Sequence, residues 1–142
     1  MAKGSGGTRK SLHPVVDDAW KQGHFIDDSF GEYRYHATTA DGLRGIIREG
    51  IKKSRGMFGS GVYFAPTEQD ALDWTTMTTG GKRLFRVKVR DLISRDYDDM
   101  DDTQGVANKN IPLSIIEIKA NGQWMSIKEY KQKYLHRWGY GQ

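Results

Sequence analysis

A glycine-rich segment, GMFGSGVYFA at residues 56–65, is the first part of this sequence that could take part in chemistry. Glycines in a loop let backbone amides approach a bound phosphate closely. The spacing here is G-x-x-G-x-G before a strand, whereas the dinucleotide-binding fingerprint is G-x-G-x-x-G between a strand and a helix. A kinase loop would need a further glycine where Phe64 stands, and the Gly-Lys-Ser/Thr of a P-loop is missing. Taken alone, the segment indicates a tight turn that leads into a strand.

The glycine-rich segment belongs to an ordered set of residues. YHAT at residues 35–38 comes first, a helical pattern follows, and Trp74 stands eleven residues after Tyr63. The set resembles the ADP-ribosyltransferase superfamily, in its diphtheria-toxin-like and poly(ADP-ribose)-polymerase-like branch. That branch has a strand histidine, usually followed by Gly and Ser or Thr, then G-x-G-[I/V]-Y-F-A and a second aromatic residue eleven positions after the tyrosine. The resemblance spans about residues 33–120, and the matching residues are His36, Ala37, Thr38, Gly59, Gly61, Val62, Tyr63, Phe64, Ala65 and Trp74.

The resemblance implies that the chain binds NAD and releases nicotinamide. The backbone after His36 would pair with the nicotinamide amide, which requires a small residue such as Ala37. The His36 side chain would hydrogen-bond the adenosine-side ribose. Tyr63 and Trp74 would enclose the nicotinamide ring, and an aromatic pair adds roughly 0.5–1.5 kcal/mol beyond burial. The expected NAD-binding residues are His36, Ala37, Thr38, Arg55, Gly59, Gly61, Tyr63, Phe64 and Trp74.

These residues also have structural interpretations. A strand histidine can be satisfied by its neighbours, and two aromatic residues can belong to the core. The cations Lys52, Lys53 and Arg55 suit a pyrophosphate, but they are equally compatible with ordinary surface charge. The sequence also departs from the polymerase-like branch at Ala71, where that branch has a serine that helps to hold the nicotinamide amide.

The third catalytic element of the family is a glutamate at the start of a late strand. It holds the 2′-hydroxyl of the nicotinamide ribose and often activates the acceptor. IPLSIIEI at residues 111–118 fits the strand that follows, and counting back from it places the glutamate position at Gln104. A glutamine can hydrogen-bond a ribose hydroxyl but cannot act as a general base. Glu117 is a less favoured alternative because it lies far into the following strand, and Asp101 and Asp102 are nearer.

The expected activity is the transfer of a single ADP-ribose from NAD to a macromolecule, with His36, Tyr63 and Gln104 as catalytic residues. The small domain suits the toxin modules at the ends of bacterial polymorphic toxins, or a phage-encoded modifier, and a toxin would imply a cognate immunity protein. The alternatives are an NAD glycohydrolase and a catalytically inactive module that binds NAD or ADP-ribose. An RNA 2′-phosphotransferase-like domain would carry arginines in place of the tyrosine, so Tyr63 argues against it.

Charge and composition narrow the possible partners. The net charge of +4 permits a polyanion, and the basic strand face of Arg86, Lys88 and Arg90 makes RNA a reasonable acceptor beside protein. The acidic run DYDDMDD at residues 96–102 fails the EF-hand pattern, because position 12 of that loop would be Ala107. A solvated acidic loop is expected there, without a metal. The chain has no cysteine, which excludes disulfides and thiolate metal sites.

The N-terminus and the hydropathy bear on localisation. Residues 1–11 have the composition of a flexible linker or tag and lack the apolar core of a signal peptide. Residues 12–142 are expected to form one domain. No apolar stretch approaches the roughly 20 residues of a membrane span. The expectation is secretion by a specialised system and action in the cytoplasm of a target cell, or otherwise a cytoplasmic protein.

Hydrophobic periodicity predicts helices and strands that do not alternate regularly, which favours the α+β class over a doubly wound sheet. The family implies a compact fold in which a split sheet surrounds an NAD cleft. Thr39, Thr67 and Ser126 are expected helix N-caps. The expected helices are residues 12–22, 39–50, 66–74 and 126–135, and the expected strands are 32–39, 61–65, 82–92 and 111–120.

Overall fold

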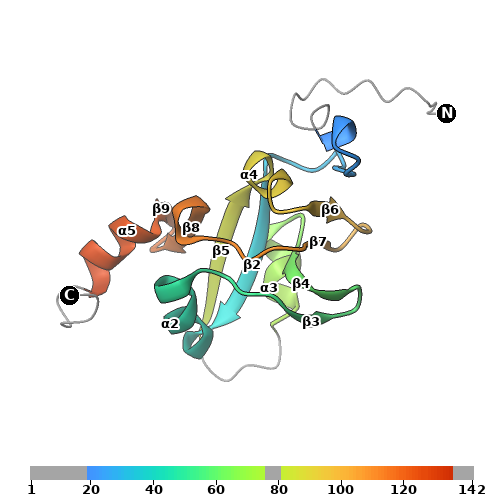
Figure 1. The fold of residues 1–142 in the computed structure, drawn as a ribbon. Coiled ribbons are helices and arrows are strands. Elements are labelled where there is room, and N and C mark those ends of the chain that lie inside the picture. The colour runs from blue at the N-terminus through green and yellow to red at the C-terminus, as the bar shows by residue number, and fades with distance from the viewer. Residues whose placement is uncertain (1–18, 76–80, 136–142) are drawn as a thin grey trace.

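The computed structural model describes residues 19–75 and 81–135 (Figure 1). The expected linker over residues 1–11 lies outside the described residues, and of the expected helix over 12–22 only residues 19–21 are described, as helical. The elements are β2 (Tyr33–Thr39), α2 (Ala40–Glu49), β3 (Ser54–Gly56), β4 (Gly59–Phe64), α3 (Glu68–Asp73), β5 (Lys82–Lys88), α4 (Val89–Ile93), β6 (Tyr97–Asp99), β7 (Gly105–Ala107), a 3₁₀ turn (Leu113–Ile115), β8 (Ile116–Ala120), β9 (Gln123–Ser126), α5 (Ile127–Tyr130) and a π-helical turn (Lys131–Leu135). Among the described residues, no helix is both long and apolar enough to cross a membrane.

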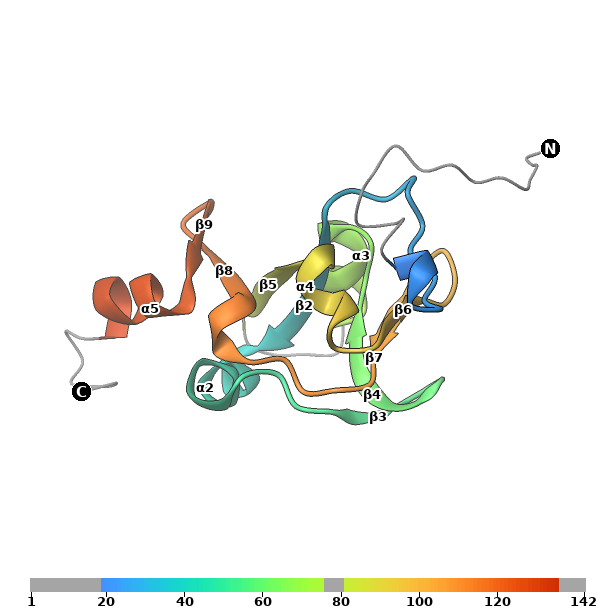
Figure 2. The ribbon, with the colours of Figure 1, turned by 45° about the horizontal axis from the view of Figure 1, so that its top comes forward.

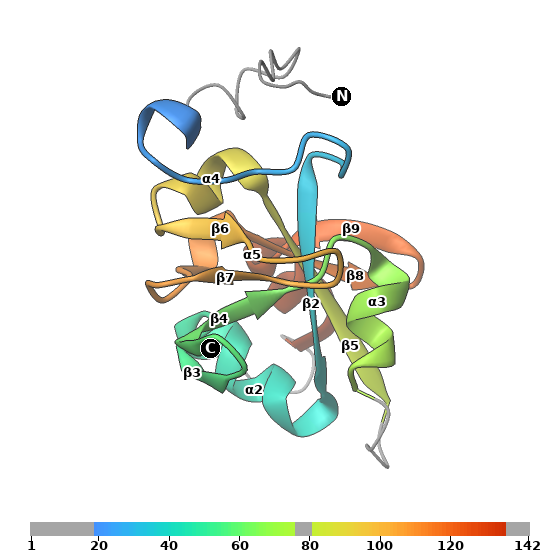
Figure 3. The same ribbon diagram turned by 90° about the vertical axis from the view of Figure 1, so that its right-hand side faces the viewer.

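The strands form two four-stranded antiparallel sheets, with the orders β2-β5-β8-β9 and β3-β4-β7-β6. The sheets meet where β2 touches the end of β4, because Tyr35 and Ala65 exchange backbone hydrogen bonds of 2.8 and 2.7 Å. Figure 3 shows β4, β6 and β7 crossing the direction of β2. In Figure 2 the β3–β4 hairpin lies at one end of the molecule and α5 with β9 at the other. This arrangement confirms the predicted α+β class.

Alternation along the strands builds the core. On β5 and β8 the buried residues Phe85, Val87, Ile116 and Ile118 face the same side, and Val62 and Phe64 of β4 join them in one cluster. Side chains of the opposite parity on β2 and β5 face α3, where Ala37 and Leu84 pack with Ala65 and Ala71. The first sheet is therefore covered on both faces along part of its length, and β2 lies at its edge beside β4.

Three helices, α2, α3 and α5, begin at the predicted caps Thr39, Thr67 and Ser126. The Thr39 hydroxyl accepts a hydrogen bond from the Gly42 amide, and α2 ends at Gly50, whose φ of 83° favours glycine. The Thr67 hydroxyl accepts one from the Asp70 amide at the start of α3. The strand predicted over 32–39 corresponds to β2, and the strand predicted over 61–65 corresponds to β4.

The sequence prediction was wrong at three element boundaries. The strand predicted over 82–92 ends at Lys88, because Val89, Leu92 and Ile93 have the helical spacing of α4 and all three are buried. The strand predicted over 111–120 begins only at Ile116, since Pro112 lacks the N–H that a ladder needs and a 3₁₀ turn follows it. The helix predicted over 126–135 changes to π-helical geometry at Lys131, although Ser126 caps its start as expected.

The prediction of a solvated acidic loop at residues 96–102 was wrong for residues 97–99, although Met100, Asp101 and Asp102 are exposed. Residues 97–99 form β6, and Tyr97 and Asp99 are buried. The reason is Arg34, which is fully buried in β2 and needs an anionic partner. Its Nε and Nη2 atoms donate to the two Asp99 carboxylate oxygens at 3.0 and 2.8 Å, and the Tyr97 hydroxyl donates to the same carboxylate at 2.6 Å.

This Arg34–Asp99 pair ties β2 to β6, and so links the two sheets. The remaining guanidinium donors also have partners, the backbone oxygens of Asp27, Gly31 and Tyr33. All five N–H donors of an arginine are therefore used. Burial raises the pKa of Tyr97 well above its ordinary value, with a further contribution from the Asp99 carboxylate, so the hydroxyl keeps its proton. A saturated pair of this kind fixes the position of β2 relative to the second sheet.

Candidate functional site

The edge of β2 next to β4 exposes backbone groups at Ala37. In an antiparallel ladder, the N–H and C=O of alternate residues point to the same side of the strand. Tyr35 directs its N–H and C=O toward Ala65, away from β5, so Ala37 directs its own the same way. Neither group of Ala37 has a hydrogen-bond partner among the residues that the structure describes. A donor and an acceptor thus lie side by side at the strand edge.

His36 connects the same part of β2 to β4. Its Nδ1 lies 2.8 Å from the backbone oxygen of Tyr63, and its ring meets the edge of the Phe64 ring with centroids 5.8 Å apart. Because a carbonyl oxygen can only accept, Nδ1 carries the proton and Nε2 is left as an acceptor. Desolvation lowers the pKa of His36, against the smaller effect of the Tyr63 oxygen, so the ring is neutral near pH 7. Its Nε2 can therefore accept a hydrogen bond from a ligand hydroxyl.

Tyr63 holds the β3–β4 hairpin in a curled shape. Its hydroxyl accepts from the Phe58 amide at 2.8 Å and donates to the Gly59 oxygen at 2.7 Å. Four extended residues would span about 13 Å, farther than a tyrosine side chain reaches, so the hairpin must bend back over the ring. The ring also lies against Gly56, where an added Cβ would be 2.3 Å from the Tyr63 Cζ.

The glycines of the segment thus have structural reasons. Gly56 leaves room for the Tyr63 ring, and a Cβ on Gly61 would meet Val106 at 2.3 Å and the Ala107 oxygen at 2.8 Å. Gly59 turns the chain with a φ of 95°. The tight turn indicated by the sequence is present, and it serves to fold a hairpin around one aromatic ring.

Strand pairing brings Gln104 to the same face of the second sheet as Tyr63. Tyr63 pairs with Val106 of β7, and Gln104 lies two residues before Val106, so the three side chains share a face. The Gln104 backbone oxygen accepts from the amides of Met100 and Asp101 at 3.0 and 3.2 Å, which closes the β6–β7 turn. Its side-chain Nε2 lies 3.7 Å from the Met57 sulfur at the hairpin tip. His36 and Tyr63 therefore come from β2 and β4, and Gln104 comes from the residue directly before β7.

The other predicted NAD-binding residues lie in varied surroundings. The Thr38 hydroxyl packs against Gly42 of α2, at 2.0 Å from where a Cβ of that glycine would be. Phe64 is completely buried, so its side chain is a core side chain. Arg55 is exposed on β3, and Trp74 is 47% exposed at the C-terminal end of α3. Of these residues, Arg55 and Trp74 present side chains that a ligand could reach.

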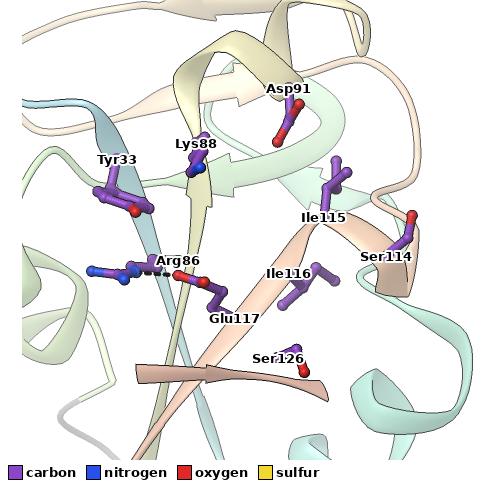
Figure 4. A pocket seen from close by; sticks show the side chains of 9 residues that line it. All are labelled: Tyr33, Arg86, Lys88, Asp91, Ser114, Ile115, Ile116, Glu117 and Ser126. Atoms are coloured by element: carbon purple, nitrogen blue, oxygen red, sulfur yellow. Dashed lines mark hydrogen bonds and ion pairs between the residues drawn. The ribbon is translucent and has the colours of Figure 1, made fainter. Parts of the chain in front are cut away.

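Glu117 lies in a different part of the first sheet (Figure 4). In register, Tyr35 of β2 pairs with Arg86, and Arg86 with Glu117. Three interstrand spacings therefore separate Glu117 from Ala65, roughly 14 Å. The Glu117 carboxylate accepts from the Arg86 Nε at 2.6 Å. The Arg86 guanidinium is itself stacked between two aromatic rings, those of Tyr33 and Trp124, at 3.8 and 4.4 Å.

This ion pair borders a pocket of about 180 Å³ on the face of the first sheet opposite to His36. Lys88, Asp91 and Ser126 also line it (Figure 4). Of the predicted basic strand face, Arg86 is committed to this stack, Lys88 is exposed at the pocket, and Arg90 lies in α4 instead of on a strand. Glu117 is thus part of a packed arrangement remote from Tyr63.

Comparison with models of known protein families and with curated protein sequences found no match. In the described ranges, no group of three His, Asp or Glu side chains is arranged to hold a metal ion. The sequence prediction missed the Arg34–Asp99 pair and the contact of Met57 with Gln104. No local signal in the sequence indicates the pair, because alternation on the strand would direct the aromatic side of Tyr33 and Tyr35, not Arg34, toward the core.

Proposed function

We propose that this chain is a mono-ADP-ribosyltransferase with an ADP-ribosyltransferase fold, which uses NAD as donor and releases nicotinamide. The observation that carries the proposal is the free backbone edge at Ala37, which lies two residues beyond the antiparallel Tyr35–Ala65 pairing, as Tyr63 lies two residues before it on β4. Nicotinamide has a primary amide with one carbonyl acceptor and two N–H donors. Such an amide can pair with the N–H and C=O of one strand-edge residue as a neighbouring strand would.

The neighbouring residues support the same ligand. The Tyr63 ring offers an aromatic surface for the nicotinamide ring. The neutral His36 accepts at Nε2 from a ribose hydroxyl, and the Gln104 amide can bond another. In the reaction the glycosidic bond between nicotinamide and the ribose breaks and an oxocarbenium-like sugar forms. The acceptor then bonds to the ribose carbon and releases its proton.

Gln104 limits what this site can do to the acceptor. A glutamine takes no proton, so the acceptor must lose its own proton to solvent or to another group. The same limit favours the transfer of one ADP-ribose over the building of a polymer. The acceptor, RNA or protein, is a part of this proposal that an assay of the purified chain can address. The toxin context, with an immunity protein and a specialised secretion route, is a further part of the proposal.

The role of the Ala37 backbone in NAD binding can be tested by a substitution that removes its N–H group. Proline lacks the N–H, and edge positions whose N–H points away from the ladder tolerate it. We expect Ala37→Pro to lose NAD binding measured by calorimetry, whereas Ala37→Ser, which keeps the N–H and is also small, binds as the unchanged chain does. Circular dichroism and urea unfolding establish that both variants are folded. A folded Ala37→Pro protein with unchanged NAD affinity contradicts the proposal.

A second candidate function is a module that binds NAD or ADP-ribose without turnover. The observation that favours it is Gln104 in place of a carboxylate. Nicotinamide release by the purified chain, with and without cell lysate, separates the possibilities. Release that requires lysate supports the transferase, equal release in both conditions supports an NAD glycohydrolase, and binding without release supports the module. Ribonuclease or protease treatment of the labelled product then identifies the acceptor class.

A further inference from the structure

The end of the second sheet displays apolar side chains to solvent. Met57 and Phe58 at the tip of the β3–β4 hairpin are 80% and 39% exposed, and Met100 in the β6–β7 turn is 45% exposed. The two segments are joined through Gln104, which contacts the Met57 sulfur at 3.7 Å and accepts from the Met100 amide at 3.0 Å. We call these three residues, Met57, Phe58 and Met100, the apolar tip. Grouped apolar side chains from separate segments are typical of an interaction site, whereas single ones are not.

The chain holds this tip in a fixed shape. The Tyr63 hydroxyl bonds the backbone of two consecutive residues, Phe58 in the turn and Gly59 at the start of β4. Because Gly56 has no side chain, the Tyr63 ring can pack against the hairpin at that position. A surface that is ordered before binding loses less entropy when a partner arrives. Methionine side chains can adapt to the shape of a partner, which suits two of the three tip residues to contact with another protein.

The charge beside the tip indicates the kind of partner. Asp101 and Asp102 follow Met100 directly and are exposed. Hydrogen bonds from the Thr103 backbone and side chain lower the pKa of Asp101, so it stays ionised at neutral pH. The exposed cations Arg55 and Lys53, in contrast, lie two and four residues before Met57. The tip is thus an apolar and locally acidic surface on a chain whose net charge is +4.

We propose that the apolar tip and the two aspartates form a docking surface for a partner protein that presents apolar side chains beside lysine or arginine. The carboxylates disfavour a nucleic acid at this surface, since phosphates would be repelled there. Apolar contact with Met57, Phe58 and Met100 would supply most of the affinity, and the aspartates would select basic partners. The proposal does not rest on the NAD chemistry proposed above, although Tyr63 and Gln104, which shape the tip, are also residues of the candidate NAD site.

Methionine methyl groups give a direct test. The full chain is labelled with ¹³C-methyl methionine, and the Met57 and Met100 signals are assigned from Met57→Leu and Met100→Leu. Met125 is 4% exposed and serves as an internal control. Three probes are titrated at physiological ionic strength: an amphipathic peptide of leucine and lysine, its leucine and glutamate counterpart, and polyuridylate.

We expect the leucine–lysine peptide to shift the Met57 and Met100 signals saturably while Met125 stays in place. The pair Asp101→Asn and Asp102→Asn should weaken that binding by about twofold to fivefold per charge removed. An equal response to the leucine–glutamate peptide, a response to polyuridylate, or none to any probe overturns the proposal. Signals that move with protein concentration alone would show that a second copy of the chain occupies the surface, which also overturns it.

Discussion

Replacing Gly56 by alanine tests whether the hairpin shape matters to the candidate site. The new Cβ would lie 2.3 Å from the Tyr63 Cζ and 2.7 Å from its hydroxyl oxygen, distances that real Cβ atoms do not show. The ring must therefore move, and the hydrogen bonds of its hydroxyl to Phe58 and Gly59 would be lost. Two such bonds at about 1 kcal/mol each amount to about 2 kcal/mol. If NAD binds only with the ring in place, its affinity falls by about thirtyfold.

Gly45→Ala is the matched control. Gly45 lies inside α2, no atom is within 4 Å of its added Cβ, and alanine favours a helix by about 1 kcal/mol over glycine. We expect this variant to be more stable to urea and unchanged in NAD affinity. Because β3 is exposed throughout, Gly56→Ala should reduce overall stability less than it reduces NAD affinity. Calorimetry and urea unfolding measure both quantities, and unchanged NAD affinity in Gly56→Ala would refute the reasoning.

Three further predictions concern single side chains. Asp99→Asn should lower the free energy of unfolding by about 3–5 kcal/mol, because it leaves a buried guanidinium without its anion, whereas the exposed Asp102→Asn should change it by less than about 0.5 kcal/mol in urea unfolding. The depressed pKa of His36 means that the folded chain disfavours the protonated ring. The free energy of unfolding should therefore be highest with respect to this ring above about pH 6.5 and should decrease as the pH falls below that value. In His36→Gln the decrease of the free energy of unfolding with falling pH should be smaller. Gln104→Glu should raise nicotinamide release by roughly a hundredfold, while Glu117→Gln leaves release unchanged; a silent Gln104→Glu with an essential Glu117 would show that the third catalytic position is misplaced.

The fold was predictable where local signals agreed. Thr39 and Thr67 cap their helices through their own hydroxyls, and the alternating pattern around Phe85 identified a strand with one buried face. These caps and this strand depend on residues that are close in the sequence, so the sequence alone predicts them. The boundary at Val89 failed because a residue there satisfies both the strand alternation and the helix spacing.

The acidic run shows why the rest could not be read. Asp99 is buried only because Arg34, sixty-five residues earlier, lies opposite it in the folded chain. Nothing local to an aspartate-rich segment distinguishes a buried residue from its solvated neighbours. For the site, the sequence identified His36, Tyr63 and Gln104 as candidates, but the curl of the hairpin and the contact of Met57 with Gln104 depend on packing between segments. Those contacts decide which surfaces a ligand or partner can reach.

One strand, β2, supplies three separate parts of the candidate site. Arg34 and His36 face the core, where one pairs with Asp99 and the other bonds Tyr63, while the backbone of Ala37 is left free at the edge. Because side chains alternate with a period of two, a slip of one residue would turn Arg34 and His36 away from the core and direct the Ala37 backbone toward β5. The Arg34–Asp99 pair opposes that slip, since the slip would take the guanidinium out of the core and leave the buried Asp99 carboxylate without its cation. The buried pair therefore helps to fix the register in which the Ala37 edge follows the Tyr35–Ala65 pairing, on the side from which β4 arrives.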